Sequence, residues 1–153
     1  MTPLPHTYAV QLTGGPAGYA ALSSPGVPNL RVAAPSDFDG PGDAWSLEHL
    51  LLAAVQACFL LTLRAVASAS KVDFLNLELD ATGIVNRENG VTRLTEIVLR
   101  PRLTVPAGAD HERVRRILEA EKHCLVSASL STPVRLDPDF IAGWIQTEVE
   151  SVM

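Results

Sequence analysis

Hydrophobic and polar positions divide the chain into an irregular first part, one long apolar segment, two alternating segments and several short helical stretches. Over residues 1–45, short extended runs at His6–Leu12 and Leu30–Ala34 are separated by Gly14-Gly15-Pro16 and Ser24-Pro25-Gly26. Glycine and proline interrupt regular structure, so these tripeptides mark turns. We therefore expect residues 1–45 to form short strands and loops.

Residues 46–69 contain no helix-breaking residue and are apolar nearly all the way round. Ser46 is a good N-cap, and Glu48 places negative charge in the first turn, where it suits the helix dipole. A helix that is apolar on every side is buried on most sides. We expect this segment to be the central helix, partly covered by a partner chain because a monomer of this size rarely surrounds so long a helix.

The same segment bears on membrane insertion. Its longest apolar segment, between His49 and Arg64, covers 14 positions and contains Gln56 and Thr62. That is short of the ~20 residues that a membrane-spanning helix needs. The run length therefore favours a buried core helix and predicts no membrane association.

Two strands with alternating hydrophobicity follow, at Phe74–Asp80 and Arg93–Val105. Alternation of this kind is typical of half-buried strands. Asn89-Gly90 lies between them and is a strong hairpin signal. The segments therefore predict an antiparallel ribbon with one solvated face. The expected inner-face residues are Leu75, Leu77, Leu79, Ile97, Leu99, Leu103 and Val105.

The last part of the chain predicts short helices and one strand. Asp110 caps a helix that runs to about Lys122, Cys124–Leu130 is a shorter helical piece and Pro133–Leu136 is a closing strand. An additional C-terminal helix is expected over residues 139–151. Together the elements predict one α+β domain over residues 1–153. The apolar stripe of the terminal helix is Phe140, Ile141, Trp144, Ile145 and Val149.

Composition narrows the function. Lysine and arginine number 12 against 17 aspartates and glutamates, for a net charge of −5. Nucleic acids and anionic membranes attract basic surfaces, so neither is an expected partner. The first ten residues show no secretory signal, and we expect a cytoplasmic protein. Two cysteines do not make a disulfide scaffold, which leaves inert packing or redox chemistry.

The sequence gives little support for phosphate binding, a serine nucleophile or a zinc site. No glycine-rich phosphate loop precedes a helix, and no serine has the setting of a nucleophile elbow. The histidines and cysteines lack the paired spacing of a zinc site. We expect no metal and no cofactor. The four histidines are His6, His49, His111 and His123.

The two cysteines and one glutamate are the candidate reactive groups. Cys58 lies in the middle of the apolar helix, where a thiol is commonly a small hydrophobe. Cys124 opens the next short helix, where unpaired backbone N–H groups would favour a thiolate. Glu48 lies ten residues before Cys58, about 15 Å along the helix and about 80° around it. It cannot act on Cys58 of its own helix, so a shared site implies a second chain.

Three segments resemble the OsmC/Ohr family of osmotically inducible and organic hydroperoxide resistance proteins. Residues 46–59 (SLEHLLLAAVQACF) resemble the motif P-E-x-L-L-x-A-A-x-x-A-C-F. Residues 120–127 (AEKHCLVS) are similar to A-x-x-x-C-P-[IV]-S, and residues 38–42 (FDGPG) to an F-x-G-x-G loop. The order of elements agrees from about residue 6 to residue 137.

The resemblance implies an OsmC-like fold, with antiparallel sheets and a long buried central helix, in an intertwined homodimer. It implies a thiol-dependent peroxidase for organic hydroperoxides in which Cys58 is the peroxidatic thiolate and Cys124 resolves its sulfenic acid as a disulfide. Glu48 of the partner chain would orient the site. A dithiol, lipoyl-type in the Ohr branch, would reduce the disulfide. Candidate walls of an apolar peroxide pocket are Trp45, Leu51, Ala54 and Phe59.

The chain departs from the family at an arginine that stabilises the thiolate. The Ohr branch carries it in a G-G-R segment, where this chain has Gly14-Gly15-Pro16. The OsmC branch carries it before the phenylalanine of the loop, where this chain has Asp37. Leu47 and Leu125 also replace family prolines. Candidate substitutes for the arginine are Arg31, Arg64, Arg93 and Arg135.

The missing arginine favours an alternative, in which the same fold binds an apolar or thiol-bearing small molecule without efficient peroxidase turnover. A third alternative is a structural dimer with two inert cysteines. Native-state thiol labelling would fail at both cysteines in that case.

Overall fold

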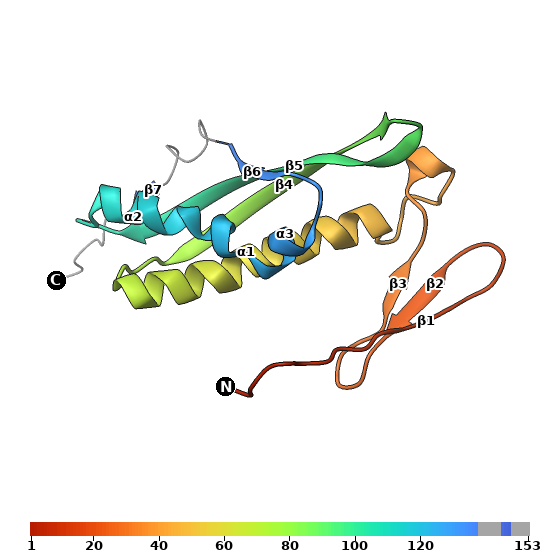
Figure 1. Ribbon diagram of the computed structural model, residues 1–153, viewed down its shortest axis with the longest axis horizontal. Helices are drawn as coiled ribbons and strands as arrows, with labels where there is room; N and C mark the ends of the chain where they lie inside the picture. Colours follow the sequence, from red (N-terminus) through yellow and green to blue (C-terminus); the bar gives the residue numbers. More distant parts are fainter. Residues whose placement is uncertain (138–144, 148–153) are drawn as a thin grey trace. The chain divides into compact units, whose positions relative to one another are not determined.

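The computed structural model describes residues 1–137 and 145–147 (Figure 1). It divides into two compact units, Met1–Leu50 and Leu51–Met153, and each is described by itself. One domain over residues 1–153 stays a prediction.

The first unit holds a three-stranded antiparallel sheet of order β1-β2-β3. The strands are β1 (Gln11–Gly14), β2 (Ala20–Ser23) and β3 (Leu30–Val32). Residues 6–10, which the sequence placed in the first strand, lie outside it. The pairing of β1 with β2 begins at Gln11 opposite Ser23, where β2 ends, so the preceding residues have no strand to join.

The sheet is followed by the 3-10 helix η1 (Ser36–Phe38), and a tight loop comes after η1. A Cβ atom on Gly40 would lie 1.7 Å from the carbonyl oxygen of Ala34, so only glycine fits there. Ser46 then caps the long helix, because its Oγ accepts from the backbone N–H of His49 at 3.2 Å. Both the loop and the cap were expected from the sequence.

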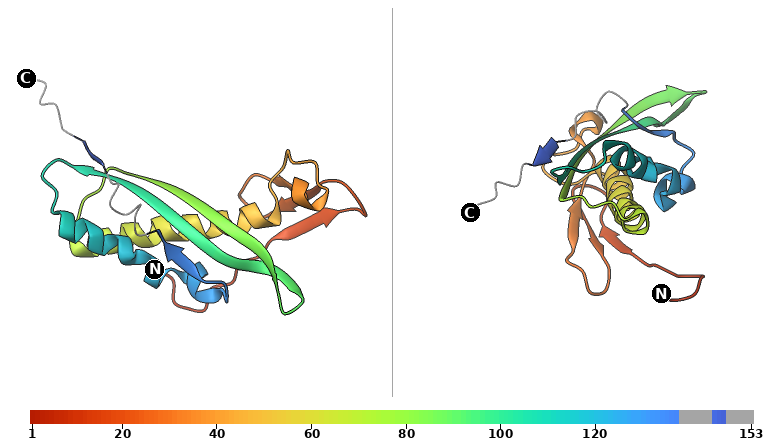
Figure 2. Two further views of the ribbon diagram at one scale, coloured as in Figure 1. Left: turned by 90° about the horizontal axis from the view of Figure 1, so that it is seen from above. Right: turned by 90° about the vertical axis from the view of Figure 1, so that its left-hand side faces the viewer.

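The second unit is built on a long antiparallel ribbon of β4 (Asn76–Glu88) and β5 (Val91–Pro106). Asn89 and Gly90 connect them with φ of 50° and 79°, the left-handed pair that a two-residue hairpin of type I′ requires. Strand β6 (Val134–Leu136) adds to β5 in parallel. The helices lie together on one face of the ribbon (Figures 1 and 2).

The core lies between that face and the helix α1 (Leu47–Ser70). Side chains four residues apart on α1 pack against the inner face of β5, as the alternation predicted. Leu77 and Leu79 of β4 are half-buried against the same core, whereas Leu75 precedes β4 and is 57% exposed. The fully buried core includes Val55, Phe59, Leu63, Ala67, Ile97, Leu99, Leu103 and Val105.

Within the described single chain, α1 is not buried on most sides, and the expected cover by a partner chain stays a prediction. Its buried residues form one stripe, and Leu61 on another face is 60% exposed. The ribbon can cover only one side of a helix, so the apolar side chains on the opposite face are exposed within the described chain. Ala54, Ala57, Leu61 and Ala65 follow one another at helical spacing on this exposed face.

Helix α1 agrees with the predicted helix in length, but its apolar part is longer than the run between His49 and Arg64 suggested. Its most apolar 18-residue window has a mean hydropathy of 2.0, enough by length and composition to cross a membrane. Gln56 and Thr62 do not interrupt this pattern. Core helices of soluble proteins meet the same test, and one stripe of α1 packs on the ribbon. The absence of membrane association stays a prediction.

The predicted terminal helix over 139–151 is wrong at residues 145–147. These residues form strand β7 (Ile145–Thr147), which pairs in parallel with Thr104–Pro106 of β5. Strand β6 pairs only with residues 97–99 of β5, so the later part of that edge has unpaired backbone groups that β7 satisfies. The other residues of the predicted helix lie outside the described residues.

The predicted helix from Asp110 to Lys122 begins as expected and then changes form. It consists of α2 (His111–Ile117) and the 3-10 helix η2 (Leu118–His123), followed by α3 (Leu125–Ser129). The Asp110 carboxylate accepts hydrogen bonds from the N–H groups of Glu112 and Arg113 at 3.0 and 3.2 Å.

Asp110→Ala should lower the free energy of unfolding by about 1 kcal/mol, because two N–H groups at the start of α2 lose their acceptor. Urea denaturation measures the change. Asp73→Ala is the control, since Asp73 is also acidic and exposed but caps no helix. Equal losses in the two variants would contradict a capping role for Asp110.

Candidate thiol site

Two helices bring the two cysteines together. Cys58 lies in the middle of α1 and is partly buried, and Cys124 precedes α3 at its N-cap and is 1% exposed. Both are free thiols, and their side chains are in hydrogen-bond contact. The turn from η2 into α3 is held by the Cys124 N–H, which donates to the Glu121 carbonyl at 3.0 Å.

Burial raises the pKa of the Cys58 thiol, but hydrogen bonds outweigh it and the pKa is lowered overall. The largest of these favourable contacts is the Cys124 thiol, followed by the backbone N–H of Val126, the Thr62 hydroxyl and the N–H of Leu125. Donors of this kind stabilise a thiolate more than a thiol. Cys58 is therefore the more acidic of the two cysteines.

The pKa of Cys124 is raised, first by burial and then by its hydrogen bond with Cys58. The sequence suggested that the N–H groups of the short helix would favour a thiolate at Cys124. The backbone N–H of Ser127 does lower the pKa of Cys124, but burial and the Cys58 thiol outweigh it. The N–H groups of Leu125 and Val126 lower the pKa of Cys58. The arrangement therefore keeps Cys124 protonated while Cys58 ionises.

Thr62 is a member of this site that the sequence reading missed. Its hydroxyl donates to the Cys58 carbonyl at 2.8 Å, and its Oγ1 lies 4.0 Å from the Cys58 Sγ. Residues four apart on a helix share a face. The four-residue spacing between Cys58 and Thr62 was the feature of the sequence that could have identified Thr62.

Thr62→Val should raise the pKa of Cys58, because valine keeps the shape of threonine and removes the hydroxyl. Thiolate ultraviolet absorbance against pH, in a Cys124→Ser background, measures it. Thr62→Ser retains a hydroxyl and should change the pKa less. A Cys58 pKa that is the same in the valine and parent proteins would contradict this contact.

Glu48 lies in the first turn of α1, ten residues before Cys58 on one continuous helix. It is not among the groups that shift the pKa of Cys58. One of its carboxylate oxygens, Oε2, is buried and has no hydrogen-bond partner among the described residues. A buried carboxylate oxygen without a partner is costly, so this position favours a further donor.

Arg31, the first candidate for the missing arginine, is engaged within the first unit. Its guanidinium stacks over the Tyr19 ring at 4.3 Å and donates to the Asp43 carbonyl at 3.2 Å. The Tyr19 hydroxyl donates to the Asp43 carboxylate at 2.7 Å. The three side chains therefore stabilise the loop before α1.

The other candidate arginines are also not among the groups that shift the pKa of Cys58. Arg93 and Arg135 form ion pairs with glutamates of the ribbon. Arg64 lies six residues beyond Cys58 on α1, about 120° around the helix. Within the described part of the chain, no arginine is among the groups that shift the pKa of Cys58.

The four residues expected to line an apolar peroxide pocket differ in burial and in location. Phe59 is fully buried in the core, so it is not open to a substrate, whereas Leu51 is half-buried and Ala54 is exposed. Trp45 lines a hollow of about 320 Å³ in the first unit, with its ring edge-on to the His49 ring at 6.2 Å.

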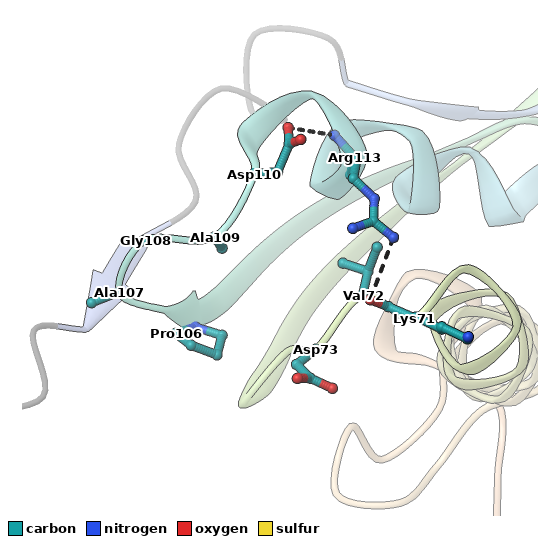
Figure 3. Close-up of a pocket in the computed structure, with 9 residues that line it drawn as sticks. All are labelled: Lys71, Val72, Asp73, Pro106, Ala107, Gly108, Ala109, Asp110 and Arg113. Atoms are coloured by element: carbon teal, nitrogen blue, oxygen red, sulfur yellow. Dashed lines mark hydrogen bonds between the residues drawn. The ribbon is translucent and has the colours of Figure 1, made fainter.

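A second hollow, of about 220 Å³, is lined by residues 71–73, 106–110 and 113, and neither cysteine is among them (Figure 3). Two of its polar side chains bind helix ends. Asp110 caps α2, and the Arg113 guanidinium donates to the carbonyls of Ser70 and Lys71 at the end of α1. Asp110 and Arg113 therefore have structural roles at the ends of helices α2 and α1.

A long helix on an antiparallel ribbon, carrying a thiol of lowered pKa against a second thiol of raised pKa, defines an α+β protein with an asymmetric cysteine pair. Residues 40–139 match the family model described as OsmC-like protein. The chain belongs to this family, and the predicted family is confirmed.

Individual relatives agree with this assignment. The uncharacterized protein YmaD of Bacillus subtilis is 28% identical over 109 residues, which cover 69% of this chain and 73% of YmaD. An OsmC-like protein of unknown function from Vibrio cholerae superposes with a TM-score of 0.80 at 16% identity, covering 87% of this chain and 99% of the other.

An organic hydroperoxide resistance protein OsmC from Legionella pneumophila superposes with a TM-score of 0.70 at 20% identity, covering 88% and 96%. At such identities the structures show the fold alone. They confirm the predicted α+β class with an OsmC-like fold. Members named for organic hydroperoxide resistance support a role of the family in peroxide stress.

Proposed function

We propose that this protein is a thiol-dependent peroxidase that reduces organic hydroperoxides through Cys58 and Cys124. The observation that carries the proposal is the unequal acidity of two adjoining thiols. A peroxidatic cysteine must be a thiolate, and its resolving partner must stay close without competing for the peroxide. The lowered pKa of Cys58 and the raised pKa of the adjoining Cys124 support these two roles.

The reaction needs two steps. The Cys58 thiolate attacks the hydroperoxide oxygen distal to carbon, the O–O bond breaks, and the alkoxide takes a proton to leave as an alcohol. The Cys124 sulfur then attacks the Cys58 sulfenic acid, the S–O bond breaks and water leaves, giving an intramolecular disulfide. A dithiol of the lipoyl type is the proposed reductant, and the cytoplasm is the proposed location.

We further propose a homodimer in which Glu48 of the partner subunit reaches the thiol site. Two observations support it. The exposed apolar face of α1 lacks cover within the described chain, and a contiguous apolar surface of this kind is typical of an interface. Glu48 is too far along α1 to serve Cys58 of its own chain, and its Oε2 lacks a hydrogen-bond partner among the described residues.

Leu61→Arg should convert the dimer to monomers, because a guanidinium would be buried unpaired in the apolar interface. Sedimentation velocity measures the change. Leu75→Arg is the control, since Leu75 is also 57% exposed but precedes β4. A parent protein that sediments as a monomer would contradict the dimer proposal directly.

The alternative function is a binding protein for an apolar or thiol-bearing small molecule. It is favoured by one observation, that no arginine within the described chain acts on Cys58. Stopped-flow thiol consumption by cumene hydroperoxide and by hydrogen peroxide separates the two. The peroxidase reacts faster with the organic peroxide than with hydrogen peroxide, whereas rates equal to those of a free thiol with both oxidants would support the binding protein.

A further inference from the structure

The raised pKa of Cys124 suits the first step of the proposed reaction and opposes the second. While Cys58 is a thiolate, the protonated Cys124 thiol donates to it and stabilises its charge. Once Cys58 is a sulfenic acid, Cys124 must lose the same proton, because the thiolate is the attacking nucleophile. Cys124 is 1% exposed, so bulk water has little access to its thiol.

The groups around Cys124 limit where that proton can go. Ser127 lies one helical turn after Cys124, in α3, and its hydroxyl is in contact with the Cys124 thiol. The same hydroxyl contacts the carboxyl group of Glu121, which lies one turn before Cys124. Ser127 Oγ is buried and has no hydrogen-bond partner among the described residues. The hydroxyl is therefore available to either group during the reaction.

We propose that Ser127 and Glu121 form the path that removes the proton from Cys124 when its sulfur attacks oxidised Cys58. The inference rests on the proposed function and adds two residues to it. Ser127 is a catalytic residue, because it touches a reacting sulfur, and Glu121 is a positioning residue that acts through Ser127.

The atoms balance without any further reagent. The Ser127 hydroxyl passes its proton to the Glu121 carboxylate and accepts the proton of Cys124. The Cys124 thiolate forms the S–S bond, and hydroxide departs from Cys58. Glu121 releases its proton as this hydroxide becomes water, so the site returns with its protons as before and a disulfide in place of the thiol and the sulfenic acid.

The electrostatics agree with this assignment. Burial raises the pKa of Glu121, which makes its carboxylate a stronger base. Lys122 is the charged neighbour that opposes this shift, and Cys58 of α1 is the titratable group that faces Cys124. His123 is next to Cys124 in the chain, but its side chain is exposed.

The test separates the two steps by single-turnover kinetics. With excess cumene hydroperoxide, Ser127→Ala and Glu121→Gln should form the sulfenic acid at the parent rate and close the disulfide at least about tenfold more slowly. Dimedone trapping measures the accumulated sulfenic acid. Glu119→Gln is the control, because Glu119 is in the same 3-10 helix but pairs with Lys122 at 3.1 Å. Glu121→Asp should recover part of the rate.

A second arm does not depend on peroxide chemistry. A small aromatic disulfide first forms a mixed disulfide at Cys58, and Cys124 then displaces the second aromatic thiol. Glu121→Gln should slow only this second release, and should remove its pH dependence near the pKa of Glu121. Equal second-release rates in the parent, Glu121→Gln and Ser127→Ala proteins would overturn the proton path. A slowed release in a protein that does not consume hydroperoxide would overturn the peroxidase and retain the path.

Discussion

Cys58→Ser is expected to lower the rate of organic hydroperoxide reduction by roughly a thousandfold or more, because a serine hydroxyl stays protonated where the thiol ionises. Cys124→Ser should differ in kind. It should retain the first step, consume one equivalent of hydroperoxide and stop at a sulfenic acid that dimedone traps. Stopped-flow measurements on both variants, with circular dichroism to verify folding, give the comparison.

The lowered pKa of Cys58 fixes the sign of the pH dependence. As pH falls through that pKa, the thiolate is protonated and the first step slows. As pH rises above it, the rate constant reaches a plateau below the ordinary pKa of a thiol. Substantial peroxide consumption by Cys58→Ser, or a first step lost equally in Cys124→Ser, would contradict the assigned roles.

Leu63→Ala is expected to cost about 2–5 kcal/mol of unfolding free energy, because Leu63 is fully buried between α1 and the ribbon. Truncation removes apolar contacts and leaves a cavity that the surrounding strands cannot fill completely. The loss is a large share of the stability of a typical domain.

Leu75→Ala is the matched control, since the same side chain there is 57% exposed. Its cost should stay under about 1 kcal/mol. Urea denaturation of the two variants at equal concentration measures both. Similar costs at the two positions would contradict the assignment of Leu63 to the core.

Local patterns predicted much of the fold. Strict alternation identified Ile97, Leu99 and Leu103 as inner-face residues, because each faces the core through the pleat of β5. Asn89-Gly90 identified the hairpin for an equally local reason. The Asp110 cap depends only on the next few residues.

Predictions that depend on distant partners were less secure. The apolar character of α1 indicated burial without telling which chain supplies the cover. Residues 145–147 form a strand because β5 extends beyond β6 and leaves an open edge. A short apolar run cannot distinguish helix from strand without that neighbour.

In the candidate site, too, local motifs were predictable and contacts between distant elements were not. Sequence motifs singled out Cys58 and Cys124, and the structure brings the two thiols into contact. Which of them is more acidic was not predictable, because two N–H groups at the start of α3 reach across to Cys58 in α1 and burial raises the pKa of Cys124. Ser127 matched the serine of the family-like segment but had no assigned role, and Glu121 was visible only as a neighbour of Cys124 in sequence.

The most direct test of the central claim is a count of thiols. One equivalent of cumene hydroperoxide is added to the reduced parent protein, and intact mass and free thiols are then measured. The account predicts the loss of both thiols and of two hydrogens per chain, with a peptide disulfide joining Cys58 to Cys124. Two thiols that remain free after the peroxide is added would contradict it.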